Sequence, residues 1–165
     1  MTALTRAWQA ALAAEHRAVF GYGVLGPHLS GAQQALAVSC SDAHEQLRDR
    51  TATALAAAGV HPAGPEADYP ELYPVTSASD AVARAARIED DCAQAWRYLY
   101  LQAASVGAAV RGSGAAVARN AAAAAAVRPA AQAGLTASAV RAVGWRVLID
   151  PADATQAFPG TGTGK

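Results

Sequence analysis

Apolar and small side chains recur along the chain at alternating spacings of four and three positions. Side chains at this spacing lie on one face of an α-helix. When the spacing continues over several turns, it is typical of helices that pack in a bundle. It predicts helices over residues 2–29, 32–58 and 79–110. An alanine-rich helix over 115–127 and a last strong helix over 130–149 follow. The expected fold is all-α, with the main helices in a four-helix bundle.

Three of the inward-facing positions carry an ionisable side chain, each near the middle of its helix. These side chains are Glu15, His44 and Glu89. Burying an unpaired charge is costly, so each of them needs a partner, which is a cation, a metal ion or a proton. The function of the protein depends on which of these partners is present.

The segment 60–78, between the second and third helices, contains four prolines and is predicted to be extended. At roughly 3.1 Å per residue it reaches on the order of 50 Å, whereas a helix the length of residues 32–58 is roughly 40 Å long. The segment can therefore travel the full length of the bundle, as the long crossover of some four-helix bundles does. In that arrangement the helices on either side of it run parallel.

Such a crossover places polar residues of all four helices at one depth in the bundle. Glu15 and His44 lie at similar distances along the chain from the turn between the first two helices, and Arg48 lies close to the same depth. Glu89 lies about as far into its helix as His44, and Arg141 returns to the same depth. We therefore predict one buried network in which two guanidinium groups pair with two carboxylates. Its members are Glu15, His44, Arg48, Glu89 and Arg141.

The remaining buried candidates are aromatic residues and cysteines. Tyr22, Trp96 and Trp145 are predicted core residues and candidates for lining a ligand pocket. Cys40 and Cys92 are predicted to be small core residues. They lie about five residues apart in depth, so no disulfide between them is expected.

Two short motifs resemble functional signatures and are rejected. Gly21, Gly23 and Gly26 match G-x-G-x-x-G, but no strand precedes them and no helix begins after them, as a dinucleotide site requires. We expect these glycines to let helices approach closely. The stretch from His44 to Arg48 departs from the zinc-protease motif H-E-x-x-H at its last position. Arginine keeps its proton and cannot ligate a metal ion there.

The composition excludes several classes of protein. Thirteen basic and thirteen acidic residues give a formal net charge of zero, which argues against a nucleic-acid-binding protein. No secretory signal is evident, and the run 115–127 is too short and too weakly apolar to span a bilayer. The 47 alanines favour helices. We expect a cytoplasmic protein without a membrane partner, for which a homodimer is one option.

Five stretches together resemble the alanine-rich, ferritin-like domain family of unknown function found in bacteria. They are AALAAEHRAVFGYGVLG, AHEQLRDR, RIEDDCAQAWR, LTASAVRAVGWR and QAFPG. The resemblance implies a ferritin-like four-helix bundle over residues 1–150 with the crossover at 60–78, and it implies no established activity. Residues 106–128 look like an insertion relative to the family pattern. Residues 151–165 form a C-terminal tail whose end is expected to be disordered.

Ferritin-like metal centres take one Glu from each of two helices and a Glu-x-x-His pair from each of the other two. Glu15 and Glu89 resemble the two lone carboxylates. In the second helix, however, Arg48 stands three residues after Glu45, where a histidine would be needed. Residues 115–149 contain no acidic residue and no histidine. A complete dinuclear site cannot be built from these residues.

Three hypotheses for the function follow. The first is a non-catalytic binding or interaction module without a cofactor, whose former metal site is replaced by the buried Glu/Arg network. The second is an iron- or manganese-dependent oxidase or peroxidase with a mononuclear site of Glu15, His44 and Glu89. The third is a carrier of a small apolar ligand, held in a pocket between the helices.

Overall fold

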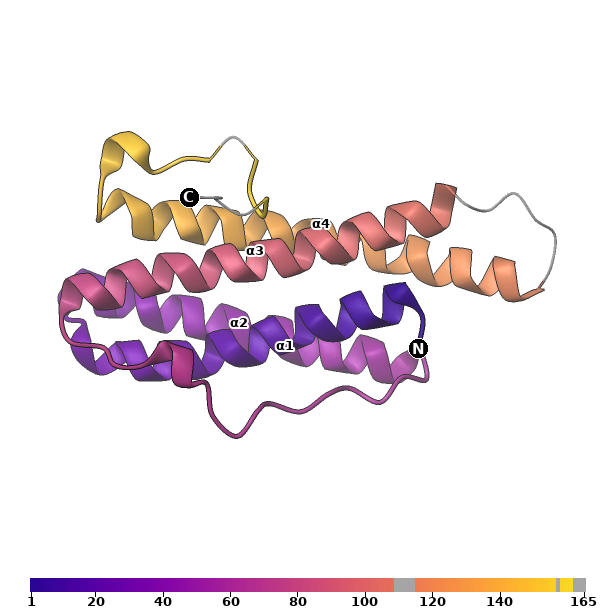
Figure 1. Cartoon of the computed structure of the whole chain (residues 1–165), viewed down its shortest axis with the longest axis horizontal. Coiled ribbons are helices and arrows are strands. Elements are labelled where there is room, and N and C mark those ends of the chain that lie inside the picture. Colours follow the sequence, from indigo (N-terminus) through magenta and orange to yellow (C-terminus); the bar gives the residue numbers. More distant parts are fainter. Residues whose placement is uncertain (109–114, 157, 162–165) are drawn as a thin grey trace.

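The computed structural model describes residues 1–108, 115–156 and 158–161. These residues form helices and connecting segments and contain no strand, so the all-α prediction is confirmed and a four-helix bundle fits the chain (Figure 1). The long helices are α1 (Ala3–Leu25), α2 (Gly31–Ala57), α3 (Ala78–Ala108) and α4 (Ala115–Val147), and the short 3-10 helices are η1 (Gly26–His28), η2 (Pro70–Leu72) and η3 (Pro151–Asp153).

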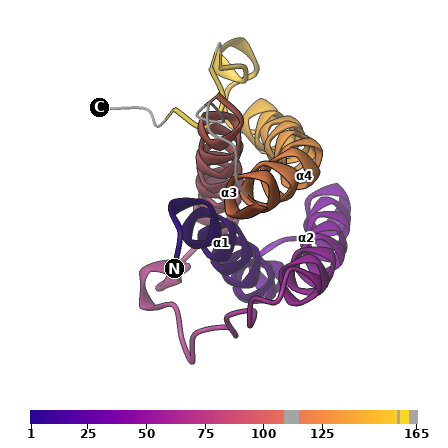
Figure 2. The ribbon, with the colours of Figure 1, turned by 90° about the vertical axis from the view of Figure 1, so that its right-hand side faces the viewer.

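Helix α2 runs antiparallel to α1, α3 runs parallel to α2, and α4 returns antiparallel to α3 (Figure 1). Helix α3 packs on both α4 and α1, and α1 packs on α2. Viewed along the bundle, α2 and α4 border its remaining side (Figure 2). None of the helices that the structure describes is both long and apolar enough to cross a membrane.

The segment between α2 and α3 is the predicted long crossover, and it lies along α1. The Gln9 side chain donates to the carbonyl oxygen of His61 (2.7 Å) and accepts from the backbone N–H of Ala63 (2.9 Å). Further along, the rings of Phe20 and Tyr69 lie 5.1 Å apart between centroids. Residue numbers rise together in the two segments, so the crossover follows α1 from one end of the bundle to the other and makes α2 and α3 parallel.

The ends of the helices differ from the predictions in three places. Helix α1 stops at Leu25, because η1, which contains Pro27, follows it. Helix α3 begins at Ala78 rather than at residue 79, and Ser77 caps it: its hydroxyl accepts the backbone N–H of Asp80 (3.1 Å). The two helices predicted over 115–127 and 130–149 are one, because α4 continues through Pro129. The helix-favouring alanines on both sides offset the one backbone hydrogen bond that proline cannot donate.

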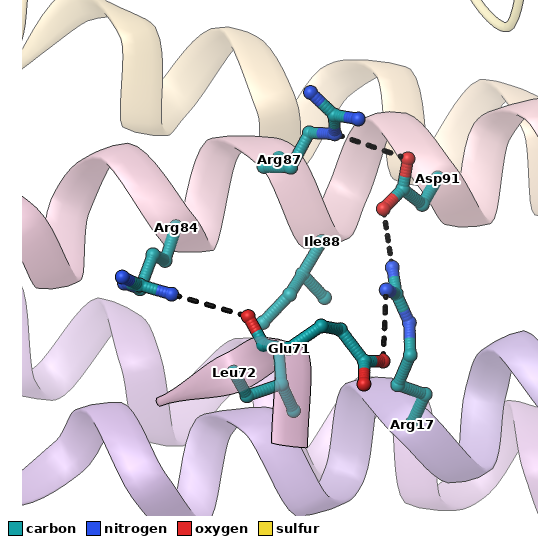
Figure 3. A pocket seen from close by; sticks show the side chains of 7 residues that line it. All are labelled: Arg17, Glu71, Leu72, Arg84, Arg87, Ile88 and Asp91. Carbon is teal, nitrogen blue, oxygen red and sulfur yellow. Dashed lines mark hydrogen bonds and ion pairs between the residues drawn. The ribbon is translucent and has the colours of Figure 1, made fainter. Parts of the chain in front are cut away.

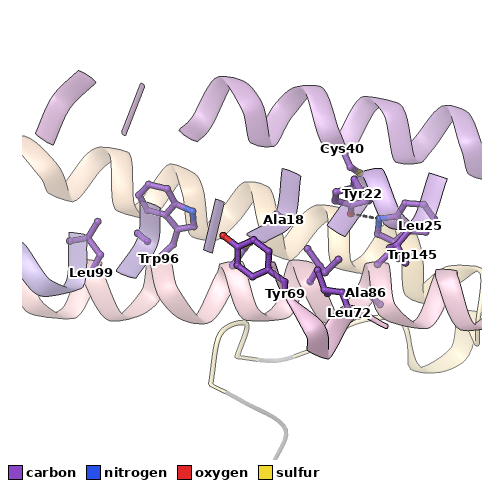
Figure 4. Close-up of a cluster of buried hydrophobic side chains, with 14 of the residues drawn as sticks. Ala18, Tyr22, Leu25, Cys40, Tyr69, Leu72, Ala86, Trp96, Leu99 and Trp145 are labelled. Carbon is purple, nitrogen blue, oxygen red and sulfur yellow. Dashed lines mark hydrogen bonds between the residues drawn. The ribbon is translucent and has the colours of Figure 1, made fainter. Parts of the chain in front are cut away.

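Small side chains bring the helices close around a few large ones (Figure 4). A Cβ atom at Gly21 would lie 2.6 Å from Ile88, which agrees with the predicted close approach, whereas Gly23 and Gly26 have no such neighbour within 4 Å. The tail after η3 turns back over α3, where Gly160 (φ +74°) lies against the backbone of Ala93. The expected disorder at 162–165, and residues 109–114 of the expected insertion, lie outside the described residues.

Candidate functional site

Helices α1, α2 and α3 bring together the three ionisable residues that the sequence places on their inner faces. Glu15, His44 and Glu89 each have an exposed fraction of 0%. The His44 ring lies between the two carboxylates: its Nδ1 is 2.7 Å from Glu15 Oε2, and its Nε2 is 3.0 Å from Glu89 Oε1. The imidazole therefore bridges α1 and α3 from its position on α2.

Four further side chains donate hydrogen bonds that extend this bridge. Arg141 Nε contacts both oxygens of Glu89 (3.0 and 2.9 Å), and the Tyr22 hydroxyl donates to Glu89 Oε1 (2.7 Å). Trp96 Nε1 donates to Glu15 Oε1 at 2.6 Å. Trp145 Nε1 donates to the Tyr22 oxygen at 2.9 Å, a bond that Figure 4 shows. We call this set the Glu–His–Glu cluster; its members are Glu15, Tyr22, His44, Glu89, Trp96, Arg141 and Trp145.

The geometry of the Glu–His–Glu cluster holds His44 in its protonated form. Burial by itself would lower the pKa of His44, but the hydrogen bonds to Glu15 and Glu89 raise that pKa to about 9. Both ring nitrogens then donate, one to each carboxylate. The two negative charges of Glu15 and Glu89 are balanced by the positive charges of His44 and Arg141. The cluster is therefore electrically neutral.

The neighbouring tyrosine and cysteine side chains are held in their neutral forms. Burial, followed by the charge of Glu89, raises the pKa of the Tyr22 hydroxyl. Burial also raises the pKa of the thiols of Cys40 and Cys92, with Glu89 and Glu15 respectively adding to it. Both cysteines are free.

The predicted network is wrong in one of its members. Arg48 does not reach the carboxylates: its Nε donates to Asp49 (2.8 Å), and its side chain is 26% exposed. Equal depth along a helix does not specify the direction in which a side chain points, and Arg48 points to the solvent side of α2. Among the described residues, Arg141 alone supplies a guanidinium to the carboxylates. Ser138, which accepts from Arg141 Nη2 (3.1 Å), was not predicted, because a lone serine in a helix carries no signal.

The predicted pocket-lining residues divide into two groups. All three use their polar atoms in the Glu–His–Glu cluster, but Trp96 also borders an open groove, whose lining does not include Tyr22 or Trp145. The predicted lining role is thus replaced, for those two, by hydrogen bonding. A buried hydroxyl or indole N–H needs a partner: the Tyr22 hydroxyl donates to Glu89, and the Trp145 N–H donates to the Tyr22 oxygen.

The groove between α2 and α4 is apolar, and its volume is about 560 Å³. Trp8 of α1 and Trp96 of α3 border it, and so do Leu47, Arg50, Thr51 and Val127. Seven alanines of α2 and α4 make up the rest of the lining. We call it the α2–α4 groove. Its volume is within the range of small-molecule sites.

A second pocket, of about 200 Å³, lies where η2 meets α1 and α3 (Figure 3). Its three arginines all have partners. Arg17 pairs with Asp91 and Glu71, Arg87 pairs with Asp91 (3.4 Å), and Arg84 donates to the carbonyl oxygen of Glu71 (3.3 Å). This pocket is a set of ion pairs that ties the crossover to the bundle.

Two residues of the Glu–His–Glu cluster lie beside a cysteine and offer donor atoms that a metal ion could use. Donor atoms of Glu15, His44 and Cys92 lie within 4.8 Å of one another, which is a geometry that can hold an ion. The charges fit poorly, however. A divalent ion that replaced the His44 proton would, together with Arg141, outweigh the charge of the two carboxylates unless Cys92 bound as a thiolate. Burial raises the pKa of the Cys92 thiol and so disfavours that form. Each buried side-chain nitrogen and oxygen in the described residues also has a hydrogen-bond partner already.

Comparison with known proteins gives a family but no activity. A solved structure, described as a conserved hypothetical protein, rv2844, from Mycobacterium tuberculosis, is similar over 88% of this chain and 96% of its own, with 29% sequence identity and a TM-score of 0.70. No protein of curated function matches. The family model described as "Domain of unknown function (DUF4439)" matches residues 7–127. Because this match covers most of the chain, the protein belongs to that family of unknown function.

Proposed function

We propose that this protein is a ferritin-like bundle that acts as a non-catalytic binding module and holds a small apolar molecule in the α2–α4 groove. In this proposal the Glu–His–Glu cluster is structural and takes the place of the metal centre of ferritin-like proteins. The parallel arrangement of α2 and α3 across a long crossover supports the ferritin-like topology.

The observation that carries the proposal is the position of Trp96. Its indole borders the α2–α4 groove, while its N–H is held by Glu15 at 2.6 Å on the interior side. The ring therefore offers the groove an apolar surface and is fixed in place. Thr51 likewise uses its hydroxyl within its own helix, where it donates to the carbonyl oxygen of Leu47 (2.6 Å). A rigid, apolar and concave surface of this kind suits a small apolar ligand.

The metalloenzyme hypothesis keeps one supporting observation, the close donor atoms of Glu15, His44 and Cys92. The charge of the cluster argues against this hypothesis, because the cluster is already neutral when His44 is protonated. Elemental analysis of the purified protein separates the two hypotheses. We expect iron and manganese well below one ion per chain. Near-stoichiometric metal that also raises the melting temperature would reject the structural role of the cluster.

Binding is tested by titration calorimetry with 1-decanol, a neutral apolar probe. Ala126 on α4 lines the groove, so Ala126→Phe should fill part of it and weaken binding by at least about tenfold, or roughly 1.4 kcal/mol. Ala122→Phe is the matched control, because Ala122 is an exposed alanine of the same helix outside the groove lining. If wild-type protein fails to bind decanol, or if both variants weaken it equally, the groove is not the ligand site.

A further inference from the structure

We infer that the ligand of the α2–α4 groove is a medium-chain carboxylate, with its acyl chain along the groove and its carboxylate on Arg50. This inference rests on the proposed binding function and adds the chemical class of the ligand. The chemistry of the groove lining supports it at three points: the polar groups, the charge and the length.

Two lining residues have hydrogen-bond donors that remain free. Trp96 has used its N–H, and Thr51 its hydroxyl proton, on internal partners, as described above. Among the described residues, the Arg50 guanidinium and the Trp8 indole N–H make no hydrogen bond or ion pair within the chain. A ligand that satisfies them must bring an acceptor, and a carboxylate or a carbonyl does so.

The charge of the groove selects between these acceptors. Arg50 is the one charged residue among the described lining residues. The nearest acidic neighbour along the helix, Asp49, is already paired with Arg48 (2.8 Å). Arg50 therefore presents an unbalanced positive charge at the edge of an apolar surface. Guanidinium binds carboxylate in a two-point arrangement that a neutral hydroxyl or carbonyl cannot match.

The length of the groove suits an extended chain. The lining residues of α2 extend from Leu47 to Ala58, and those of α4 extend from Ala123 to Ala133. At 1.5 Å per residue each stretch is about 15 Å long. Arg50 lies near one end of the α2 stretch, and the alanines follow towards the other end. An acyl chain anchored at Arg50 would therefore lie along the alanines, next to the indole of Trp96.

The experiment compares decanoate with 1-decanol by titration calorimetry at neutral pH. We expect wild-type protein to bind decanoate about tenfold more tightly than decanol. Arg50→Gln should lower the affinity for decanoate more than the affinity for decanol and so remove this preference, and Arg50→Lys should recover part of it. Arg87→Gln is the matched control: it removes an equal charge from a side chain that is 79% exposed and lies outside the groove lining. It should leave the preference intact.

The outcomes separate this inference from the function on which it rests. If decanol and decanoate bind equally and Arg50→Gln changes neither, the carboxylate assignment is wrong while apolar binding in the groove stands. If neither probe binds, both proposals are overturned. If Arg87→Gln lowers decanoate affinity as much as Arg50→Gln does, the preference comes from overall charge, and the assignment of Arg50 is wrong. Unfolding curves of each variant show whether it folds.

Discussion

At the scale of single residues, His44 determines the chemistry of the interior. Its ring bridges Glu15 and Glu89, and it also stacks on Tyr22 with 5.6 Å between ring centroids. Neither nitrogen of the ring is left without a carboxylate to donate to. The histidine is therefore a fixed cation of the core.

This geometry predicts a pH dependence of stability. The folded pKa of His44 is about 9, above its ordinary value of 6.5, so the bridge stabilises fully below pH 6.5 and its contribution is lost as pH rises through 9. A shift of this size corresponds to on the order of 3 kcal/mol. Urea unfolding from pH 6 to pH 10 measures the loss.

His44→Gln provides the control for this prediction. The variant should be less stable at pH 6.5 and should lack most of the pH dependence between 6.5 and 9. Arg141 stays charged over this range. Tyr22, Cys40 and Cys92 ionise in the unfolded chain near their ordinary pKa values of 9.0 to 10.0, but they do so in both proteins, so the difference between the two curves reports His44. Stability that does not change in wild-type protein across this range would contradict a protonated His44.

A second residue-scale prediction compares two arginines. Arg141→Met removes the guanidinium from fully buried Glu89 and should lower the free energy of unfolding by about 3–5 kcal/mol. Adding Glu89→Gln should restore much of it, because the charge and its partner leave together. Arg48→Met removes only a surface pair and should cost less than about 1 kcal/mol. Equal losses in the two single variants, measured by urea unfolding, would place Arg48 in the buried network after all.

At the scale of elements, α4 shows how small residues position large ones. Most of its residues are alanine or other small side chains, so its contact with α3 depends on close backbone approach. Gly134 is the tightest point. A Cβ atom there would lie 2.4 Å from Cδ2 of the Trp96 ring, whereas one at Gly144 would have no such neighbour within 4 Å.

These two glycines of one helix form a matched pair for mutation. Gly134→Ala should destabilise the protein by about 1–3 kcal/mol, because the indole is rigid and must move. It should also shift the tryptophan fluorescence, since Trp96 would leave Glu15. Gly144→Ala should be neutral or stabilise by up to about 1 kcal/mol through helix propensity. If Gly134→Ala unfolds like wild type with unchanged fluorescence, the close packing of α4 on Trp96 is wrong.

At the scale of the whole molecule, the crossover decides how the helices are ordered. It follows α1 on the outside of the bundle and brings the chain back to the end where α2 began (Figure 1). Only this return makes α2 and α3 parallel and aligns His44 with Glu89. The two hydrogen bonds of the Gln9 side chain hold the early part of the crossover to α1.

Gln9→Ala tests this attachment. Loss of both bonds should cost about 1–2 kcal/mol and speed hydrogen exchange at the Ala63 amide, which donates to Gln9. The matched control is Gln94→Ala, since Gln94 is an exposed glutamine of α3 with no side-chain hydrogen bond among the described residues. If hydrogen exchange at Ala63 is unchanged in Gln9→Ala, or is equally faster in both variants, the crossover is held elsewhere.

The sequence by itself determined the helices, the crossover and the meeting of Glu15, His44, Glu89 and Arg141 at one depth. Spacing and segment length measure position along a helix axis, and those positions survive folding. The direction of each side chain around the axis, and the distance between helices, depend on packing. For that reason only the tertiary structure decided that Arg48 faces water, that Tyr22 and Trp145 join the cluster, and that a groove lies between α2 and α4.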